Sequence, residues 1–69
     1  MNDIERKFIL ALAESNMKIY RARKKVFLSD SGFRYHLNKI QKETGLSPWN
    51  FYDLIKLVEM AKEKDDEGI

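Results

Sequence analysis

The sequence predicts an all-α fold, a compact domain of three to four helices without a sheet. Apolar residues recur at helical spacing in four stretches, and the strict alternation typical of strands is absent from the sequence. Ser, Asp, Asn and Gly residues and one Pro separate these stretches, as expected at helix ends. A chain of 69 residues buries only a thin core. We therefore expect one domain over residues 1–62, followed by an acidic, disordered tail over residues 63–69.

The first helix is expected from Asp3 to Ser15, with Asp3 as its N-cap and Asn16 as its stop. Its apolar stripe comprises Ile4, Phe8, Ala11 and Leu12. Ile9 and Leu10 widen that stripe, so this helix should pack against neighbours on two sides.

The second helix is expected from Lys18 to Lys25. Ile19, Ala22 and Val26 follow one another at helical spacing and give it a short inward stripe. Phe27 and Leu28 come next, and we expect both to anchor the following connection in the core.

The third helix is expected over about residues 30–43, after a capping cluster formed by Ser29-Asp30-Ser31. Its inward face comprises Phe33, Leu37, Ile40 and Thr44. Thr44-Gly45 is a helix stop of the glycine type.

Ser47-Pro48 is expected to open the fourth helix, with Ser47 as the cap and Pro48 at the first helical position. Its apolar band comprises Trp49, Tyr52, Leu54, Ile55, Leu57, Val58 and Ala61. We expect the aromatic cluster of Trp49, Phe51 and Tyr52 to lie in the core. The alternative is a dimer surface, because a domain this small often cannot cover such a cluster alone.

Charge is distributed unevenly along the chain, although the net charge is only +2. Residues 17–42 hold eight basic residues and one acidic residue, which gives +7, whereas residues 1–16 carry −1 and residues 43–69 carry −4. Such a block attracts a polyanion, and phosphate contacts dominate the affinity of proteins for nucleic acids. From charge alone, a solvated basic face without a partner is the alternative.

Two short helices joined by a tight turn, the second capped by Ser or Asp, have the layout of a helix-turn-helix domain. In that layout the second helix enters the major groove of DNA, where Arg pairs with guanine and Asn with adenine. The base contacts expected here are Ser31, Gly32, Arg34, Tyr35 and Asn38. The phosphate contacts expected here are Lys24, Lys25, Ser29, Lys39 and Lys42.

A family pattern runs through this segment in Val26-Phe27-Leu28, Arg34-Tyr35, Leu37, Lys39-Ile40 and Thr44-Gly45-Leu46. With these residues the chain resembles the C-terminal helix-turn-helix of PucR-type transcription regulators and, more weakly, the Fis-type DNA-binding domain. The resemblance covers roughly residues 8–58, and it implies a transcriptional regulator that docks its third helix in the major groove. The chain departs from the family pattern at Asp30-Ser31-Gly32, Arg23, Lys25 and His36.

Other classes of function have little support in the sequence. Ser29, Asp30, Ser31 and His36 lie too close along one helix to surround a substrate, so we expect no enzyme. His36 is the only histidine and there is no cysteine, so we expect neither a metal nor another cofactor. No secretory signal or apolar membrane span is evident, which favours a cytoplasmic protein without a membrane or small-molecule partner.

Two alternatives to DNA binding stay open. The first is a protein-interaction module that uses the aromatic C-terminal helix. The second is a non-specific RNA-binding domain that uses the basic block. The sequence also allows a homodimer through the C-terminal aromatic helix.

Overall fold

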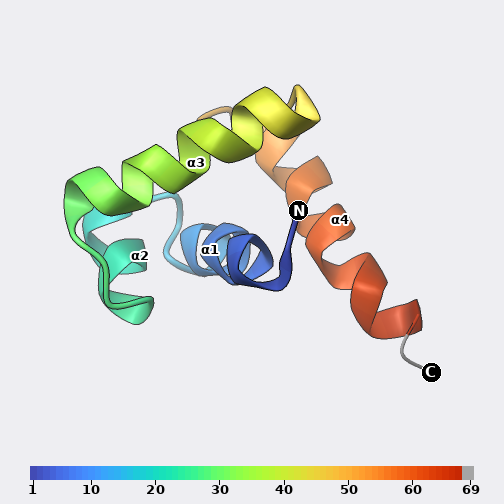
Figure 1. Cartoon of the computed structure of the whole chain (residues 1–69), viewed down its shortest axis with the longest axis horizontal. Coiled ribbons are helices and arrows are strands. Elements are labelled where there is room, and N and C mark those ends of the chain that lie inside the picture. The colour runs from blue at the N-terminus through green and yellow to red at the C-terminus, as the bar shows by residue number, and fades with distance from the viewer. Residues whose placement is uncertain (68–69) are drawn as a thin grey trace.

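Four helices form an all-α domain in the computed structural model, which describes residues 1–67, with side chains to residue 63. The helices are α1 (Asp3–Glu14), α2 (Ile19–Lys25), α3 (Asp30–Thr44) and α4 (Phe51–Glu67). In Figure 1, α1 lies in the middle, with α3 above it and with α2 and α4 at opposite ends. Helix α1 packs against each of the other three, whereas α4 packs against α1 alone among the described helices. No described helix is long and apolar enough to cross a membrane.

The core comes mainly from α1, α3 and α4. Phe33, Leu37 and Ile40 are fully buried, which confirms the inward face predicted for the third helix. Around them lie Phe8, Ile9, Ala11, Leu12, Ala22, Leu54, Leu57 and Ala61. Ile4 was wrongly assigned to this interior and is exposed, because in the first turn of α1 it lies at the edge of the stripe that Glu5, Phe8 and Leu12 bury.

The N-terminus of α1 is held by a capping box one residue earlier than expected. Asn2 Oδ1 accepts from the Glu5 N–H at 2.8 Å, and Glu5 Oε1 accepts from the Asn2 N–H at 3.0 Å. Asp3 is therefore the first helical residue and not the cap, and its carboxylate pairs with Arg6 at 2.8 Å. The helix ends at Glu14, one residue before the expected end. Asn16 and Met17 then take left-handed conformations, with φ of 55° and 65°.

The turn between α2 and α3 directs alternate side chains to opposite sides. Lys18 is the N-cap of α2 and not its first residue. Val26 and Leu28 pack against the core. Phe27, which was expected to do the same, is 94% exposed. Its backbone is left-handed (φ 58°), so the chain reverses at this residue and the ring points outward.

Helix α3 ends at Gly45, as the sequence predicts, and is one residue longer than expected. Gly45 has φ 76°, and its N–H donates to the Gln41 carbonyl at 2.9 Å. Thr44 Oγ1 donates to the Ile40 carbonyl at 2.8 Å, so Thr44 belongs to the last turn.

Helix α4 begins at Phe51 and not at Pro48. Ser47 Oγ accepts from the Trp49 N–H at 3.2 Å and so closes a turn, and Pro48 is buried. Asn50 Oδ1 then accepts from the Asp53 N–H at 3.0 Å and acts as the actual cap. Because α4 continues to Glu67, the tail expected over residues 63–69 overlaps its last turn. Residues 68 and 69 of that tail lie outside the described part of the chain.

Candidate nucleic-acid interface

Helix α3 presents a broad exposed arc beside α2. Its opposite face is fixed in the core by Phe33, Leu37 and Ile40. At 3.6 residues per turn, the exposed arc contains Arg34, Asn38, Ser31, Lys42 and Tyr35, in order from one edge to the other. All five are exposed, so the arc contains four of the five predicted base contacts and one predicted phosphate contact.

Gly32, the fifth predicted base contact, belongs to the capping structure of α3. Its N–H donates to Ser29 Oγ at 3.1 Å, and a Cβ added at Gly32 would lie 3.1 Å from the same oxygen. Ser29 Oγ also lies 3.5 Å from Ser31 Oγ. Ser29 and Gly32 therefore fix the first turn of α3, while Ser31 is the outward hydroxyl of this group.

Arg34 is held from two directions. Its Nε donates to Asp30 Oδ2 at 2.8 Å, one turn earlier on α3. Its guanidinium carbon also lies 5.6 Å from the centre of the Trp49 ring, within the range of a cation–π contact. Asp30, which departs from the family pattern, is thus a partner of Arg34, and both terminal nitrogens of Arg34 are left for other contacts.

Trp49 also contacts Asn38. Its Nε1–H donates to Asn38 Oδ1 at 3.3 Å, so one indole contacts two of the predicted base-contacting residues. Sequence reasoning missed this role. The one available signal was the glycine stop at Gly45, which reverses the chain so that the following residues can return along α3.

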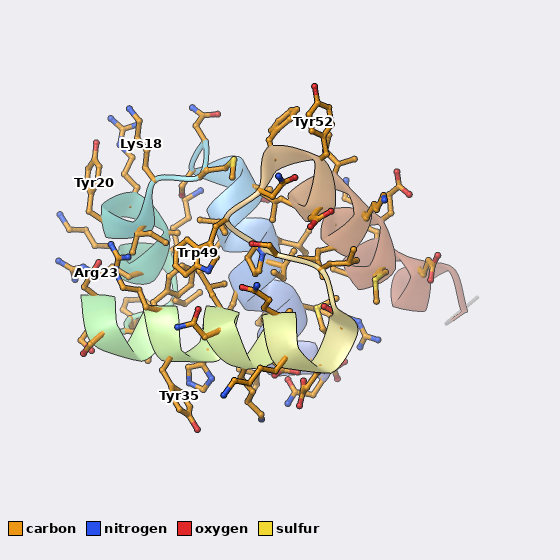
Figure 2. All side chains as sticks on the ribbon, turned by 90° about the horizontal axis from the view of Figure 1, so that it is seen from above. Lys18, Tyr20, Arg23, Tyr35, Trp49 and Tyr52 are labelled. Atoms are coloured by element: carbon orange, nitrogen blue, oxygen red, sulfur yellow. The ribbon has the colours of Figure 1, made fainter. Side chains whose placement is uncertain are left out.

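Tyr35 lies on the other side of α3 from Trp49, as Figure 2 shows from above. Its ring contacts His36 edge-on, with 5.4 Å between centroids. The His36 ring in turn lies 4.9 Å from that of Phe8 in α1. His36 is thus a half-buried packing residue that supports Tyr35.

Two predicted phosphate contacts have acidic partners within the chain. Lys39 Nζ lies 3.8 Å from Glu5 Oε2 and 4.0 Å from Glu43 Oε2. Lys25 Nζ lies 3.6 Å from Glu14 Oε1. These partners offset part of the positive charge of Lys39 and Lys25.

The remaining cations of the basic block have no such partner. Among the residues with described side chains, none of these cations lies within ion-pair distance of an acid: Lys18, Arg21, Arg23, Lys24 and Lys42. Four of them belong to α2 or its N-cap, and the labelled Lys18 and Arg23 are seen there in Figure 2. Lys18, Arg21 and Arg23 were not among the predicted phosphate contacts. The signal that could have found them is the lack of any acidic residue between Ser15 and Ser29.

The aromatic cluster of the C-terminal region lies at the surface, contrary to its expected place in the core. Phe51 is 59% and Tyr52 74% exposed, and Trp49 is also exposed. The buried stripe of α4 is formed by Leu54, Leu57 and Ala61, so a helix turns Tyr52 to the opposite face. This leaves a second exposed surface, on α4.

Comparisons of the chain with protein-family models, with curated proteins and with solved structures find no match. Its function is therefore inferred from its own residues and their geometry.

Proposed function

We propose that the chain is a helix-turn-helix DNA-binding domain that acts in transcription regulation. In this proposal α3 docks in the major groove of duplex DNA, and α2 lies against the phosphate backbone. The observation that supports it best is the group of unpaired cations, Lys18, Arg21, Arg23, Lys24 and Lys42, beside the exposed arc of a firmly braced helix.

The exposed arc of α3 offers side chains that can recognise bases. With its Nε on Asp30, Arg34 keeps both terminal nitrogens for a bidentate contact with guanine. Asn38 accepts from Trp49 through Oδ1, so its amide nitrogen is the group that donates to a base. Ser31 adds a hydroxyl in the middle of the arc, and Tyr35 adds one at the edge opposite Arg34. Gly32 has no side chain, so the backbone at the helix start can approach the DNA closely.

The direct test is a titration of the full chain with a labelled duplex of mixed sequence at two salt concentrations. Five phosphate contacts predict that the affinity falls roughly 500-fold between about 50 and 200 mM salt. Lys24→Ala should weaken binding, whereas Lys56→Ala, an exposed lysine of α4, is the matched control. No binding at the lower salt concentration would refute the proposal.

Sequence recognition needs a separate experiment. Selection from a random oligonucleotide pool should give a preferred duplex, and Arg34→Ala or Tyr35→Ala should relax the preference at particular positions. Double-stranded RNA is the competitor, because its deep and narrow major groove does not admit a reading helix. If double-stranded RNA competes as well as DNA does, the unpaired cations bind nucleic acid non-specifically and α3 does not read the major groove.

A second candidate function is protein interaction through α4. The exposure of Phe51 and Tyr52 favours it, since large exposed apolar groups often mark interaction surfaces. Amide chemical-shift changes distinguish the two functions: DNA should affect Arg34 to Lys42, whereas a protein partner should affect Trp49 to Val58.

A further inference from the structure

Asn38 can offer only part of its amide to DNA, because Trp49 engages the other part. The indole Nε1–H donates to Asn38 Oδ1 at 3.3 Å. An indole nitrogen can donate a hydrogen bond but cannot accept one, so the contact fixes which end of the amide faces the ring. The Asn38 side chain is exposed, so its amide nitrogen is the end that remains for a ligand.

Arg34, one turn earlier on the same edge of α3, is restricted in a similar way. Its Nε donates to Asp30 Oδ2 at 2.8 Å, and its guanidinium carbon lies 5.6 Å from the centre of the Trp49 ring. The two terminal nitrogens remain, and a guanidinium has no acceptor atom. Arg34 and Asn38 therefore present hydrogen-bond donors along this edge, while Asp30 and Trp49 engage their other polar atoms.

The major groove distinguishes bases by the donors and acceptors on their edges. Guanine presents two acceptors there, N7 and O6, whereas adenine presents the N7 acceptor and the N6 amino donor. An asparagine recognises adenine when its oxygen accepts from N6 and its nitrogen donates to N7. With its oxygen engaged by Trp49, Asn38 would leave the adenine amino group without a partner, and a buried polar group without a partner is costly. Guanine has no such donor on this edge.

We infer that α3 selects guanine at both positions that Arg34 and Asn38 contact, and that Trp49 determines the choice at Asn38. This inference rests on the proposed DNA-binding function. Four residues of a helix span about 6 Å, and stacked bases lie about 3.4 Å apart, so the two guanines should be one or two base pairs apart. Trp49 touches no base in this arrangement. It is a positioning residue that sets specificity through the amide of Asn38.

The test is selection from a random duplex pool, followed by affinity measurements on duplexes that differ at a single base pair. Asn38→Ala and Arg34→Ala identify the two positions, because each variant should lose the preference at one position only. At the Asn38 position, the original chain should bind the G·C duplex at least about fivefold more tightly than the A·T duplex. A preference for adenine at that position, or equal affinity for the two duplexes, overturns the inference.

Trp49→Phe tests the role of the indole nitrogen directly. Phe keeps a ring beside Arg34 but has no donor for Asn38 Oδ1, so the freed amide can pair with adenine through both of its polar atoms. The preference at the Asn38 position should shift from guanine to adenine, while guanine is retained at the Arg34 position. A loss of stability alone would not change the preferred base at one position only. An unchanged preference at both positions overturns the role assigned to Trp49.

Two controls keep the outcomes distinct. Tyr52→Phe removes the hydroxyl of another exposed aromatic residue, whose ring contacts Phe51, and should leave both base preferences unchanged. Trp49 is outside the buried core, so circular dichroism of Trp49→Phe should show the helices intact. If the original chain binds no duplex at low salt, the proposed function fails and this inference fails with it. If the chain binds duplex DNA but prefers adenine at the Asn38 position, this inference alone fails.

Discussion

The indole ring of Trp49 lies 5.6 Å from the guanidinium carbon of Arg34 and also donates a hydrogen bond to Asn38 at 3.3 Å. Trp49 belongs to the segment between α3 and α4, which thereby returns along the exposed edge of α3. Arg34 and Asn38 are one turn apart on that edge, so a single ring restricts the motion of both. In the proposed DNA-binding function, Trp49 is a positioning residue.

Replacing Trp49 should therefore weaken DNA binding without removing any group that touches DNA. Trp49→Ala removes both contacts and should lower the affinity for a selected duplex about tenfold. Trp49→Phe keeps a ring for the cation–π contact but loses the Nε1 donor, so its effect should be smaller. Anisotropy titration measures the affinity, and urea unfolding measures stability in parallel. Reduced stability with unchanged DNA affinity would show that Trp49 has only a structural role.

Lys24 and Lys25 are neighbours whose charges should count differently towards phosphate binding. Lys24 has no acidic partner among the described side chains, whereas Lys25 lies 3.6 Å from Glu14. Lys24→Ala should reduce the slope of log affinity against log salt by about one. Lys25→Ala should reduce it by less than half as much, because Glu14 already offsets its charge. Equal slopes for the two variants would contradict a role for the internal ion pair.

Phe27 holds an unfavourable backbone conformation without burying its ring. A left-handed conformation costs a bulky residue roughly 1–2 kcal/mol, and Gly adopts it without that cost. Phe27→Gly should accordingly raise the free energy of unfolding by up to about 1 kcal/mol, after the entropy of Gly in the unfolded chain is subtracted. Phe27→Ala is the control, since it removes the exposed ring but keeps the strain. Its free energy of unfolding, measured by thermal unfolding, should stay near that of the original chain. A larger loss of stability for the Gly variant than for the Ala variant would refute the strain argument.

Gly45 and Gly32 should respond differently to the same substitution. At Gly45 an added Cβ meets no atom within 4 Å, but φ is 76°, so Gly45→Ala should cost about 1 kcal/mol through backbone strain alone. At Gly32 the backbone is helical, and the added Cβ would meet only the exposed cap hydroxyl of Ser29 at 3.1 Å. Gly32→Ala should be within about 0.5 kcal/mol of the original chain, because the gain in helix propensity offsets that contact. Chemical denaturation of both variants measures the difference.

The parts of the fold that could be predicted are those that local rules determine. The inward face of α3 follows from the spacing of Phe33, Leu37 and Ile40, and its end follows from Gly45. The helix starts were harder, because nearby residues compete as caps. Asn2 caps α1 although Asp3 is equally suited by type, and Asn50 caps α4 although Ser47 precedes a proline.

The candidate site was harder to predict because its side chains are fixed by residues distant in sequence. The sequence indicates that Arg34 and Asn38 face outward, yet it does not reveal that Trp49 contacts both. Similarly, the pairing of Lys39 with Glu5 joins α3 to α1, and spacing within one helix gives no sign of it. Hydrophobicity alone misplaced Phe51 and Tyr52, whereas the helical positions of Leu54 and Leu57 correctly identify the buried face.

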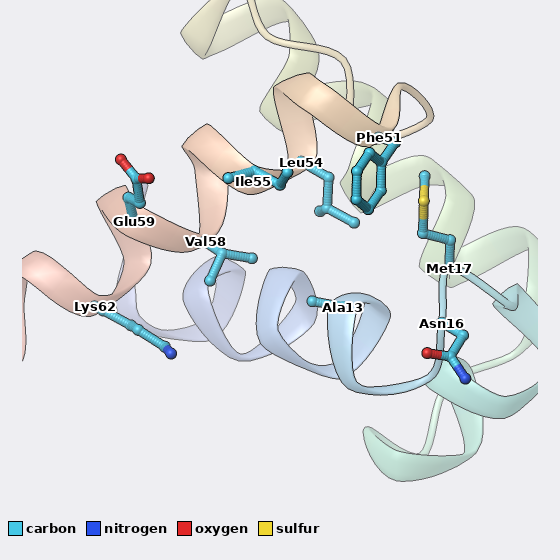
Figure 3. A pocket seen from close by; sticks show the side chains of 9 residues that line it. All are labelled: Ala13, Asn16, Met17, Phe51, Leu54, Ile55, Val58, Glu59 and Lys62. Atoms are coloured by element: carbon cyan, nitrogen blue, oxygen red, sulfur yellow. The ribbon is translucent and has the colours of Figure 1, made fainter.

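Helix α1 is the only described helix that packs against all of the others. The unpaired cations of α2 and α3 lie on one side of it. An apolar groove lies on another and is lined by Ala13, Met17, Phe51, Ile55 and Val58, among others (Figure 3). Both surfaces rest on α1, but no residue of α2 or α3 lines the groove. Substitutions on one surface should therefore leave the other undisturbed, provided that the interior residues of α1 are retained. In fewer than seventy residues, the two surfaces are thus structurally separate apart from their common support on α1.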